Sequence, residues 1–178
     1  MKPWKTISRT TILDHSKWLK VEDHTIELPD GTILEKWCWI ISPDYVNVVV
    51  ENSDGNFLCF RQTKYAADGI TLAPVGGYLE PNETPLDCAK RELREEMGCI
   101  AAEWISLGRF PCDGNHGMGF ANLFLARGAE KTGEIVADDL EEQEIVVLTR
   151  NELMQALLNG EFKVLSWSTA VALSLFHI

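Results

Sequence analysis

Two mostly apolar stretches in the first half of the chain have the length and composition of β-strands. Residues 46–51 (VNVVVE) and 57–62 (FLCFRQ) are rich in β-branched, aromatic and other apolar side chains. They flank residues 52–55 (NSDG), which are typical of the turn of a hairpin. Residues 71–75 are a further strand candidate, which ends at a pair of glycines. The pattern therefore predicts a sheet that contains an antiparallel hairpin.

The hydrophobic spacing becomes helical in residues 85–97. Thr84 can cap the first turn, and Pro85 suits the first helical position. Gly98 can end the helix. Apolar side chains recur three or four positions apart, at Leu86, Ala89, Leu93 and Met97. These signals predict one amphipathic helix that packs its apolar stripe on the sheet.

The rest of the chain mixes strand and helix patterns. Residues 1–42 are a small β-rich segment and a candidate dimerisation element, and residues 43–178 are expected to form the main domain. Hairpins combined with helices predict an α+β fold with a mixed sheet rather than a doubly wound fold. Strand candidates occur at 104–110, 121–126 and 145–149, and helix candidates at 151–158 and 166–176.

Composition narrows the classes of function. The formal net charge of −11 disfavours a general nucleic-acid binder, which needs a basic surface. No run of 18 apolar residues is present, and residues 1–10 lack the apolar core of a secretory signal. The five cysteines include no CxxC pair, which indicates free thiols in a reducing compartment. We therefore expect a cytoplasmic protein with neither a membrane nor a nucleic-acid partner.

Three glutamates lie on one stripe of the predicted helix. Glu95 and Glu96 fall within about 60° of Glu92 on the helical wheel. Like charges at this spacing repel each other, and Arg91 can relieve part of the repulsion by pairing with Glu95. Carboxylate oxygens suit hard divalent cations. A solvated acidic face is the alternative, but a docked helix preceded by a flexible glycine pair favours a metal site, where a backbone carbonyl could add a ligand.

A longer motif contains these glutamates. It consists of Gly77, Glu83, Arg91, Glu92, Leu93, Glu95, Glu96, Gly98 and Cys99. In this order and spacing they resemble the Nudix box, G-x5-E-x7-R-E-U-x-E-E-x-G-U, in which U is a bulky apolar residue. Residues 28–31 (LPDG), 61–62 (RQ) and 74–77 (PVGG) resemble the ADP-ribose and ADP-sugar pyrophosphatase branch. The resemblance implies an α/β/α sandwich with a mixed sheet, preceded by a small β-domain that often helps to build a homodimer.

The resemblance also implies roles for the box residues. Glu92 and Glu96 would bind Mg²⁺, for which Mn²⁺ could substitute, and Glu95 would be a further ligand at higher metal occupancy. The Gly76 carbonyl would complete the ligand set. Arg91 would orient Glu95 or its neighbours rather than touch substrate, so that Arg91 and Glu95 belong to the catalytic set. Such ions neutralise phosphate oxygens and activate water.

A base must take the proton of the attacking water. In this branch it is often a glutamate from a loop after the box. Here residues 138–144 (DDLEEQE) precede the strand candidate at 145–149. Alignment back from that strand favours Glu141, with Glu142 second, and a solvated acidic loop is the alternative. Glu83 would hold the geometry of the loop and the helix.

Substrate recognition gives weaker signals. Arg61 and Lys64 can meet phosphates that the metal leaves uncovered, although ordinary surface charge is the alternative. Trp18 and Trp37 lie near positions where related enzymes stack an adenine, and packing is the alternative for both. His116 can contact phosphate or simply lie on a surface loop.

We therefore predict a hydrolase that cuts the diphosphate bond of a small molecule of the ADP-ribose or ADP-sugar type. The products would be a nucleoside monophosphate and a sugar phosphate. Residues 111–120 depart from the branch, because position 114 is glycine in a region where ADP-ribose enzymes usually have proline. Alternatives are house-cleaning of nucleoside triphosphates, nucleotide sensing without hydrolysis, and isomerisation of prenyl diphosphates. The intact box acids disfavour the sensor.

Overall fold

The computed structural model describes residues 1–136 and 142–177, which form two compact units. The N-terminal unit comprises Met1–Asp44 together with Phe110–Phe120. The main unit comprises Tyr45–Arg109 and Ala121–Ile178. The sequence predicted a boundary at residue 42. That boundary leaves out Phe110–Phe120, the second segment of the N-terminal unit.

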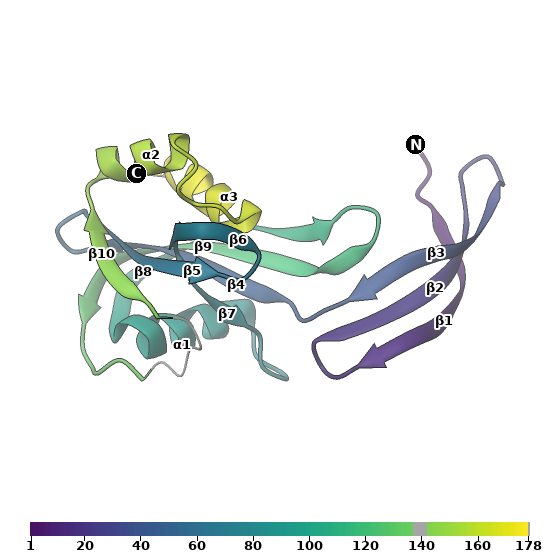
Figure 1. Ribbon diagram of the computed structural model, residues 1–178, viewed down its shortest axis with the longest axis horizontal. Coiled ribbons are helices and arrows are strands. Elements are labelled where there is room, and N and C mark those ends of the chain that lie inside the picture. Colours follow the sequence, from purple (N-terminus) through teal and green to yellow (C-terminus); the bar gives the residue numbers. More distant parts are fainter. Residues whose placement is uncertain (137–141, 178) are drawn as a thin grey trace. The chain divides into compact units, whose positions relative to one another are not determined.

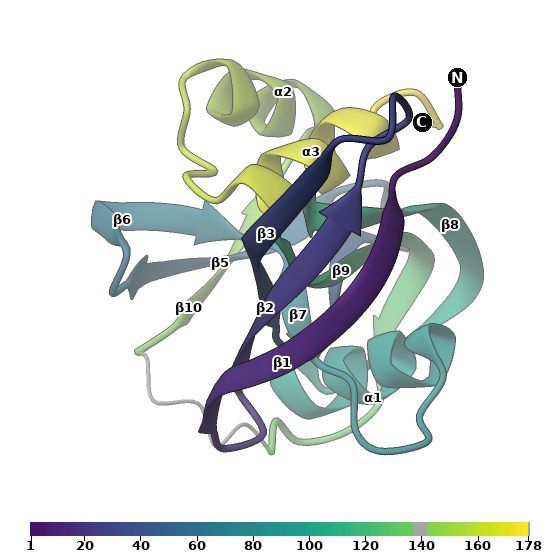
Figure 2. The same cartoon turned by 90° about the vertical axis from the view of Figure 1, so that its right-hand side faces the viewer.

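The N-terminal unit is built on a three-stranded antiparallel sheet (Figure 2). Its strands are β1 (Lys5–His15), β2 (Leu19–Glu27) and β3 (Ile33–Ile41). β1 is the edge strand, and all its residues are exposed. The tip of a later hairpin adds to β3, where the backbone N–H of Ile40 donates to the carbonyl of His116 at 2.8 Å. This contact explains why residues 110–120 belong to the N-terminal unit.

The main unit is a mixed sheet between helices (Figure 1). Its central strand, β4 (Tyr45–Asn52), runs parallel to β9 (Gly117–Lys131) and antiparallel to its other partners. The other elements are β5 (Phe57–Lys64), β6 (Ala67–Ala73), β7 (Val75–Tyr78), β8 (Cys99–Asp113), β10 (Glu144–Leu148), α1 (Pro85–Met97), α2 (Arg150–Leu158) and α3 (Leu165–Ser174).

Helices cover both faces of this sheet. Figure 1 shows α1 on one side and α2 with α3 on the other, and α1 and α3 both contact β4. Residues 46–50 of β4 are accordingly all buried, because a strand with both faces covered loses the usual alternation of buried and exposed positions. The predicted α/β/α sandwich with a mixed sheet is confirmed.

The sheet divides beside β4. β7 pairs with the first half of β4, over Tyr45–Val48, whereas β5 pairs with it only at Val50 and Glu51. From Phe60 onward β6 replaces β4 as the partner of β5, while β10 pairs with the other side of β5 from Phe57 to Arg61. β7, which carries the glycine pair, and the end of β5 therefore belong to separate branches of the sheet.

Helix α1 has the predicted start and end. The Thr84 hydroxyl accepts a hydrogen bond from the backbone N–H of Asp87 at 3.2 Å, and Pro85 begins the first turn. Gly98 ends the helix with φ of +65°. The buried side of the helix consists of Cys88, Ala89, Leu93, Met97 and also Glu96. Glu96 is thus a buried carboxylate on the side of α1 that packs against the sheet, and the spacing of apolar residues did not predict its burial.

Two elements differ from the sequence prediction. The single strand expected at residues 71–75 is two strands, because Pro74 lacks an N–H and separates β6 from β7. Residues 111–120 are mainly the ends of β8 and β9 rather than a loop, with only 114–116 in the turn. Gly117 and Gly119 have φ of +86° and +73°, which lets the strand begin in a conformation that the hydrophobic pattern does not reveal.

We predict that Gly98→Ala destabilises the main unit by about 1–3 kcal/mol. The left-handed backbone disfavours a side chain. The added Cβ would also lie 2.6 Å from the carbonyl oxygen of Gly133. Gly98 also fixes the chain that follows β9, because its carbonyl accepts hydrogen bonds from the N–H groups of Thr132 and Gly133. Urea unfolding measures the effect.

Gly133→Ala is the matched control. A Cβ at Gly133 meets nothing within 4 Å, and its φ lies outside the left-handed region. We expect a change below about 0.5 kcal/mol. Equal losses in the two variants would contradict the role given to Gly98.

Candidate active site

Arg91 on α1 joins the helix to the loop before it. Its Nε and Nη2 donate to the two oxygens of Glu83 at 2.8 and 3.0 Å. Its Nη1 donates to Glu92 at 2.7 Å and to Glu95 at 3.0 Å. Nη2 also donates to the carbonyl of Tyr78 at 3.2 Å. All five N–H groups of the guanidinium therefore bind protein oxygens, which leaves none for a substrate phosphate.

The contacts of Arg91 favour the ionised form of the groups that they join. The Arg91 guanidinium lowers the pKa of Glu83 to about 2, and the carboxylates in turn raise the pKa of Arg91. Glu83 also accepts a hydrogen bond from the backbone N–H of Glu80 at 3.0 Å. One guanidinium thus faces three carboxylates, those of Glu83, Glu92 and Glu95, and the cluster keeps a negative excess.

The glycine pair is a close-packed corner against the same helix. A Cβ on Gly77 would overlap the carboxylate of Glu92. A Cβ on Gly76 would lie 2.5 Å from Nδ2 of Asn47 and 2.6 Å from the carbonyl oxygen of Val46. Only glycine fits at either position. The absence of side chains there lets the backbone of β7 come close to the acids of α1.

The buried Glu96 is held at this corner. Its carboxylate accepts a hydrogen bond from the backbone N–H of Gly76 at 3.2 Å. Gly76 is paired in register with Asn47 of β4. In an antiparallel pair, a residue whose N–H points away from the partner strand turns its carbonyl away as well. The Gly76 carbonyl is therefore on the side of the glutamates.

The oxygens at this corner fit a hard divalent cation in their chemistry. Within residues 1–136 and 142–177, no three or more His, Cys, Asp or Glu side chains lie in a geometry that could hold a metal ion. The carboxylates are instead turned toward Arg91 and the Gly76 N–H. The candidate ligand atoms are carboxylate and carbonyl oxygens, and the carboxylates outnumber the one guanidinium, which suits Mg²⁺. The residues that would hold it are Gly76, Glu92, Glu95 and Glu96.

A second set of predicted residues meets at the end of β5. Arg61 and Glu142 line one cavity of about 320 Å³ in the main unit. The Arg61 guanidinium pairs with the carboxylate of Glu144, which lies opposite it on β10, at 3.3 Å. Lys64 ends β5 outside this lining, and Glu141 falls in the segment 137–141, outside the described residues.

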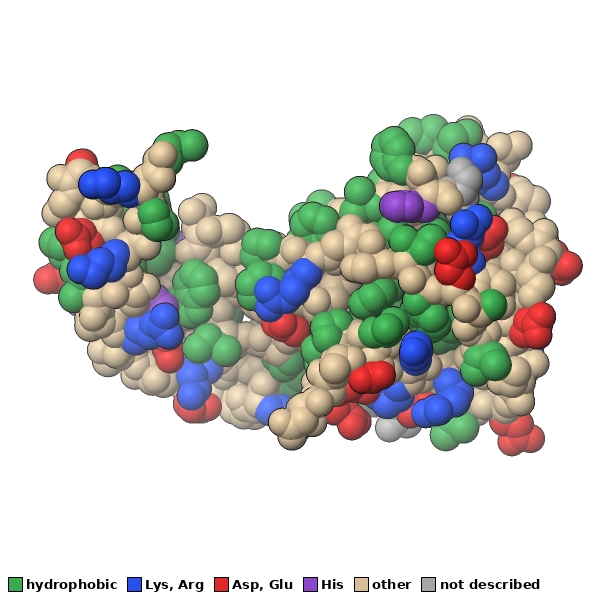
Figure 3. Space-filling view, turned by 180° about the vertical axis from the view of Figure 1, so that it is seen from behind, with side chains coloured by type: hydrophobic (Ala, Val, Ile, Leu, Met, Phe, Trp, Pro, Cys, Tyr) green, Lys and Arg blue, Asp and Glu red, His purple; other side chains and the backbone are tan. Residues whose placement is uncertain are grey.

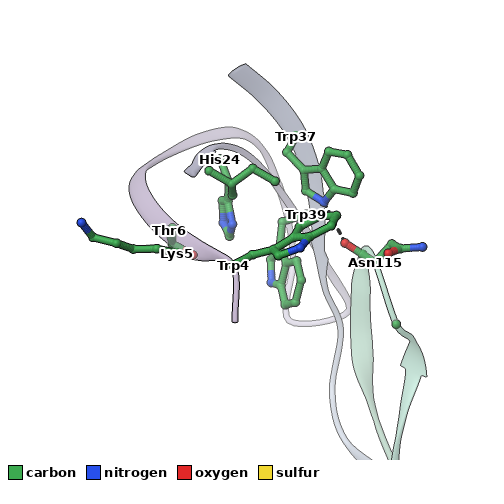
Figure 4. A pocket seen from close by; sticks show the side chains of 9 residues that line it. Trp4, Lys5, Thr6, His24, Trp37, Trp39 and Asn115 are labelled. Carbon is green, nitrogen blue, oxygen red and sulfur yellow. Dashed lines mark hydrogen bonds between the residues drawn. The ribbon is translucent and has the colours of Figure 1, made fainter. Parts of the chain in front are cut away.

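An aromatic cavity of about 310 Å³ lies within the N-terminal unit (Figure 4). Trp37 lines it, and its indole N–H donates to the carbonyl of Asn115 at 2.8 Å. The ring stacks on His116 with centroids 5.7 Å apart, and Trp4 meets it edge-on at 5.4 Å. Two of the predicted substrate residues, Trp37 and His116, are thus in contact with each other.

Sequence reasoning missed part of this cavity. Trp39 and His24 also line it and stack on each other with centroids 5.4 Å apart. Trp39 could have been found, because residues two apart on a strand share a face and Trp37 was already a candidate. Trp18 does not line the cavity. It is 48% exposed, with the Lys17 ammonium 4.4 Å from its ring centroid.

The surface seen in Figure 3 carries basic side chains interspersed with acidic ones. That face has no continuous basic patch of the kind that binds a nucleic-acid backbone. Among the described residues, no helix is long and apolar enough to cross a membrane.

Comparison with known families decides the identity of the fold and the box. The profile of the Nudix domain matches residues 42–167. The chain belongs to the Nudix family. The profile of the nucleoside diphosphate sugar hydrolase N-terminal domain matches residues 4–36. The predicted family and its ADP-sugar pyrophosphatase-like branch are confirmed, and the corner around Arg91 is the Nudix box of this protein.

Two curated proteins and one solved structure are also similar to this chain. The RNA pyrophosphohydrolase of Halorhodospira halophila is 43% identical over 63 residues, which are 35% of this chain and only 33% of that protein. The methanol dehydrogenase activator of Bacillus methanolicus is 26% identical over 98% of this chain and 92% of its own length. The crystal structure of an ADP compounds hydrolase has the same fold, with a TM-score of 0.81 and 19% sequence identity. The match covers 98% of this chain and 93% of that one.

We predict that Glu83→Gln makes folding stability less dependent on acid pH. The folded pKa of Glu83, about 2, lies below the ordinary value of 4.5, so ionised Glu83 stabilises the fold above pH 4.5. That contribution, on the order of 2 kcal/mol at pH 7, is lost as pH falls through the folded pKa. Urea unfolding of both proteins at pH 7 and pH 3 should therefore show a gap that narrows at pH 3.

Glu80→Gln, at an exposed position of the same loop, is the control and should match the wild type at both pH values. A gap between wild type and Glu83→Gln that stays constant with pH would show that the Arg91–Glu83 ion pair is not its source.

Proposed function

We propose that this Nudix protein hydrolyses the diphosphate bond of ADP-ribose or ADP-sugar compounds with Mg²⁺ as cofactor. A nucleoside monophosphate and a sugar phosphate would be the products. The observation that carries the proposal is the corner itself, where Glu92 and Glu96 meet the glycine pair and Arg91 joins Glu95 to Glu92. The nucleoside diphosphate sugar hydrolase match at residues 4–36 supports the substrate class, as does the shared fold of an ADP compounds hydrolase.

The box residues would hold the cofactor. Glu92, Glu95, Glu96 and the Gly76 carbonyl would be its ligands. When bound, the ion supplies charge neutralisation at phosphate oxygens and lowers the pKa of a coordinated water. Arg91 holds Glu92 and Glu95 in place on a rigid helix, and preorganised ligands need little rearrangement during the reaction.

The remaining tasks fall to residues outside the box. Glu142 lines the cavity at the end of β5 and is the described candidate for the base, while Glu141 stays a prediction. Arg61 and Lys64 would meet the diphosphate. Stacking of the nucleobase would fall to the aromatic cavity around Trp37, since flat rings pack well against indoles.

Assembly and location are part of the proposal. An exposed edge strand with apolar side chains favours pairing with a second copy. β1 is such an edge, and Ile7, Ile12 and Leu13 on it are about half exposed, which supports a homodimer. All five cysteines are free, which supports a reducing cytosol.

We predict that Glu92→Gln and Glu96→Gln each reduce kcat/KM for ADP-ribose at least a hundredfold in Mg²⁺. Each change removes a charged oxygen from the proposed ligand set. Titration of Mn²⁺, followed by electron paramagnetic resonance, should show weaker binding in both variants. This readout does not depend on turnover.

Glu103→Gln is the matched control, because it removes a carboxylate whose side chain is 59% exposed on β8 of the same unit. Its turnover and its Mn²⁺ binding should equal those of the wild type. Wild-type turnover in Glu92→Gln would remove this residue from the reaction.

A substrate panel tests the chemistry directly. ADP-ribose, ADP-glucose, NADH and the four nucleoside triphosphates are assayed with Mg²⁺, and products are identified by mass after reaction in H₂¹⁸O. We expect the two ADP-sugars to have the highest kcat/KM. Faster turnover of a triphosphate would overturn the proposed substrate class, and binding without turnover of any compound would indicate a sensor.

A further inference from the structure

His24 is a buried histidine that uses only one of its two ring nitrogens. The residue is 4% exposed, and its Nε2 lies 2.9 Å from a carboxylate oxygen of Glu22. Its Nδ1 has no hydrogen-bond partner among the residues that the structure describes. Because a carboxylate accepts hydrogen bonds and does not donate them, the proton of the neutral ring is on Nε2. Nδ1 is then an acceptor.

Nδ1 of His24 reaches accessible space even though the residue is buried. Across residues 1–136 and 142–177, two side-chain N or O atoms are both fully buried and without a partner, Oδ1 of Asn47 and Oε1 of Gln62. Nδ1 of His24 is not one of them, so it is not fully buried. The space that His24 lines is the aromatic cavity of about 310 Å³ in the N-terminal unit (Figure 4). An unused acceptor therefore lies on the wall of this cavity.

The strand register puts His24 on the same face of the sheet as two tryptophans of β3. Directly opposite residues of an antiparallel pair share a face, and so do residues two apart on one strand. His24 is paired with Trp37, and Trp39 follows two positions later. Trp39 stacks on the imidazole with centroids 5.4 Å apart. The stacking and the bond to Glu22 together hold the ring in one orientation.

The wall of the cavity favours a flat, uncharged ring that carries a hydrogen-bond donor. None of the nine lining residues is an acid, and the lysine among them, Lys5, is paired with Glu27 at 3.5 Å. Trp4 and Trp37 stand at 82° to each other, so a flat ring can stack on one indole and turn its edge to the other. The volume is at the low end of ligand pockets, about 300–1,000 Å³, which suits one ring system. A nucleobase with an exocyclic amino group supplies both the flat faces and the donor.

We propose that His24 accepts a hydrogen bond from the exocyclic amino group of the base and so makes the enzyme prefer adenine to hypoxanthine. At position 6 adenine has an amino group that donates, whereas hypoxanthine has a carbonyl that accepts. That carbonyl would face the lone pair of Nδ1 and leave two acceptors without a donor, which is unfavourable. This inference rests on the proposed hydrolysis of ADP-ribose compounds and names the side chain that reads the base.

The test uses two pairs of compounds that differ only in the base. The Kd values for AMP and IMP are measured without metal by quenching of tryptophan fluorescence, which does not depend on turnover. The KM values for ADP-ribose and IDP-ribose are measured with Mg²⁺. In the wild type we expect both constants to be about five- to tenfold lower for the adenine compound, the size of one hydrogen bond.

His24→Phe removes both ring nitrogens and keeps a flat ring that can stack on Trp39. We expect the constants for the adenine compounds to rise to within twofold of those for the hypoxanthine compounds, with kcat nearly unchanged. The constants for the hypoxanthine compounds should not rise, which shows that the cavity is still formed. Because the change leaves the carboxylate of Glu22 without its partner, a second variant combines it with Glu22→Gln. This double variant should lose the preference in the same way.

Lys5→Ala is the matched control in the same cavity. The side chain of Lys5 is 74% exposed, and its ammonium can attract the phosphate of either nucleotide. Its removal should change the Kd values for AMP and IMP by the same factor and keep the preference for adenine.

The outcomes separate the two proposals. If the wild type hydrolyses neither ADP-ribose nor IDP-ribose, the proposed function fails, and the Kd values for AMP and IMP still decide the role of His24. That role is overturned if the wild type binds AMP and IMP equally, binds IMP more tightly, or binds neither. It is also overturned if both His24 variants keep the preference for adenine, while hydrolysis of ADP-ribose would stand.

Discussion

The hydrogen bonds of Arg91 are the constraint on which the site depends. The box places several carboxylates within two helical turns of one another, and their mutual repulsion would disperse them on an isolated helix. The guanidinium sits between them and binds Glu83 on the loop, Glu92 and Glu95 on α1, and the carbonyl of Tyr78 after the glycine pair. One side chain therefore neutralises part of the charge and also fixes the loop to the helix.

The glycine corner complements this arrangement from the backbone side. The carboxylate of Glu92 occupies the space that a side chain on Gly77 would fill, and Glu96 is buried against the N–H of Gly76. The apolar stripe of α1 packs on the sheet and keeps the helix at this distance. Core packing, close backbone approach and ion pairing thus act on the same few acids.

Contacts between residues close in sequence could be predicted, and contacts between distant residues could not. The caps of α1 and the ion pair between Arg91 and Glu95 follow from spacings of three or four residues, so the sequence predicted them. The pairing of Arg61 with Glu144 spans 83 positions and depends on the register of β10 against β5. The aromatic cavity likewise needs residues near 115 to meet β3, and nothing in the hydrophobic pattern indicates which strand a hairpin tip joins. Trp18, chosen from resemblance alone, lies outside that cavity.

Arg91 is saturated by its protein partners, and this limits how the proposed site could hold a diphosphate. A guanidinium that already binds five protein oxygens cannot exchange them for phosphate without releasing the acids it positions. On the proposed function, the carboxylates around Arg91 would repel an anionic substrate, so attraction would have to come from bound cations and from the branch of the sheet that carries Arg61. Arg61 is half exposed and its pair with Glu144 is a surface contact, which costs little to open. On that proposal the two branches of the sheet would have different tasks: α1 and β7 would gather the cation, while β5 would supply Arg61 for the diphosphate.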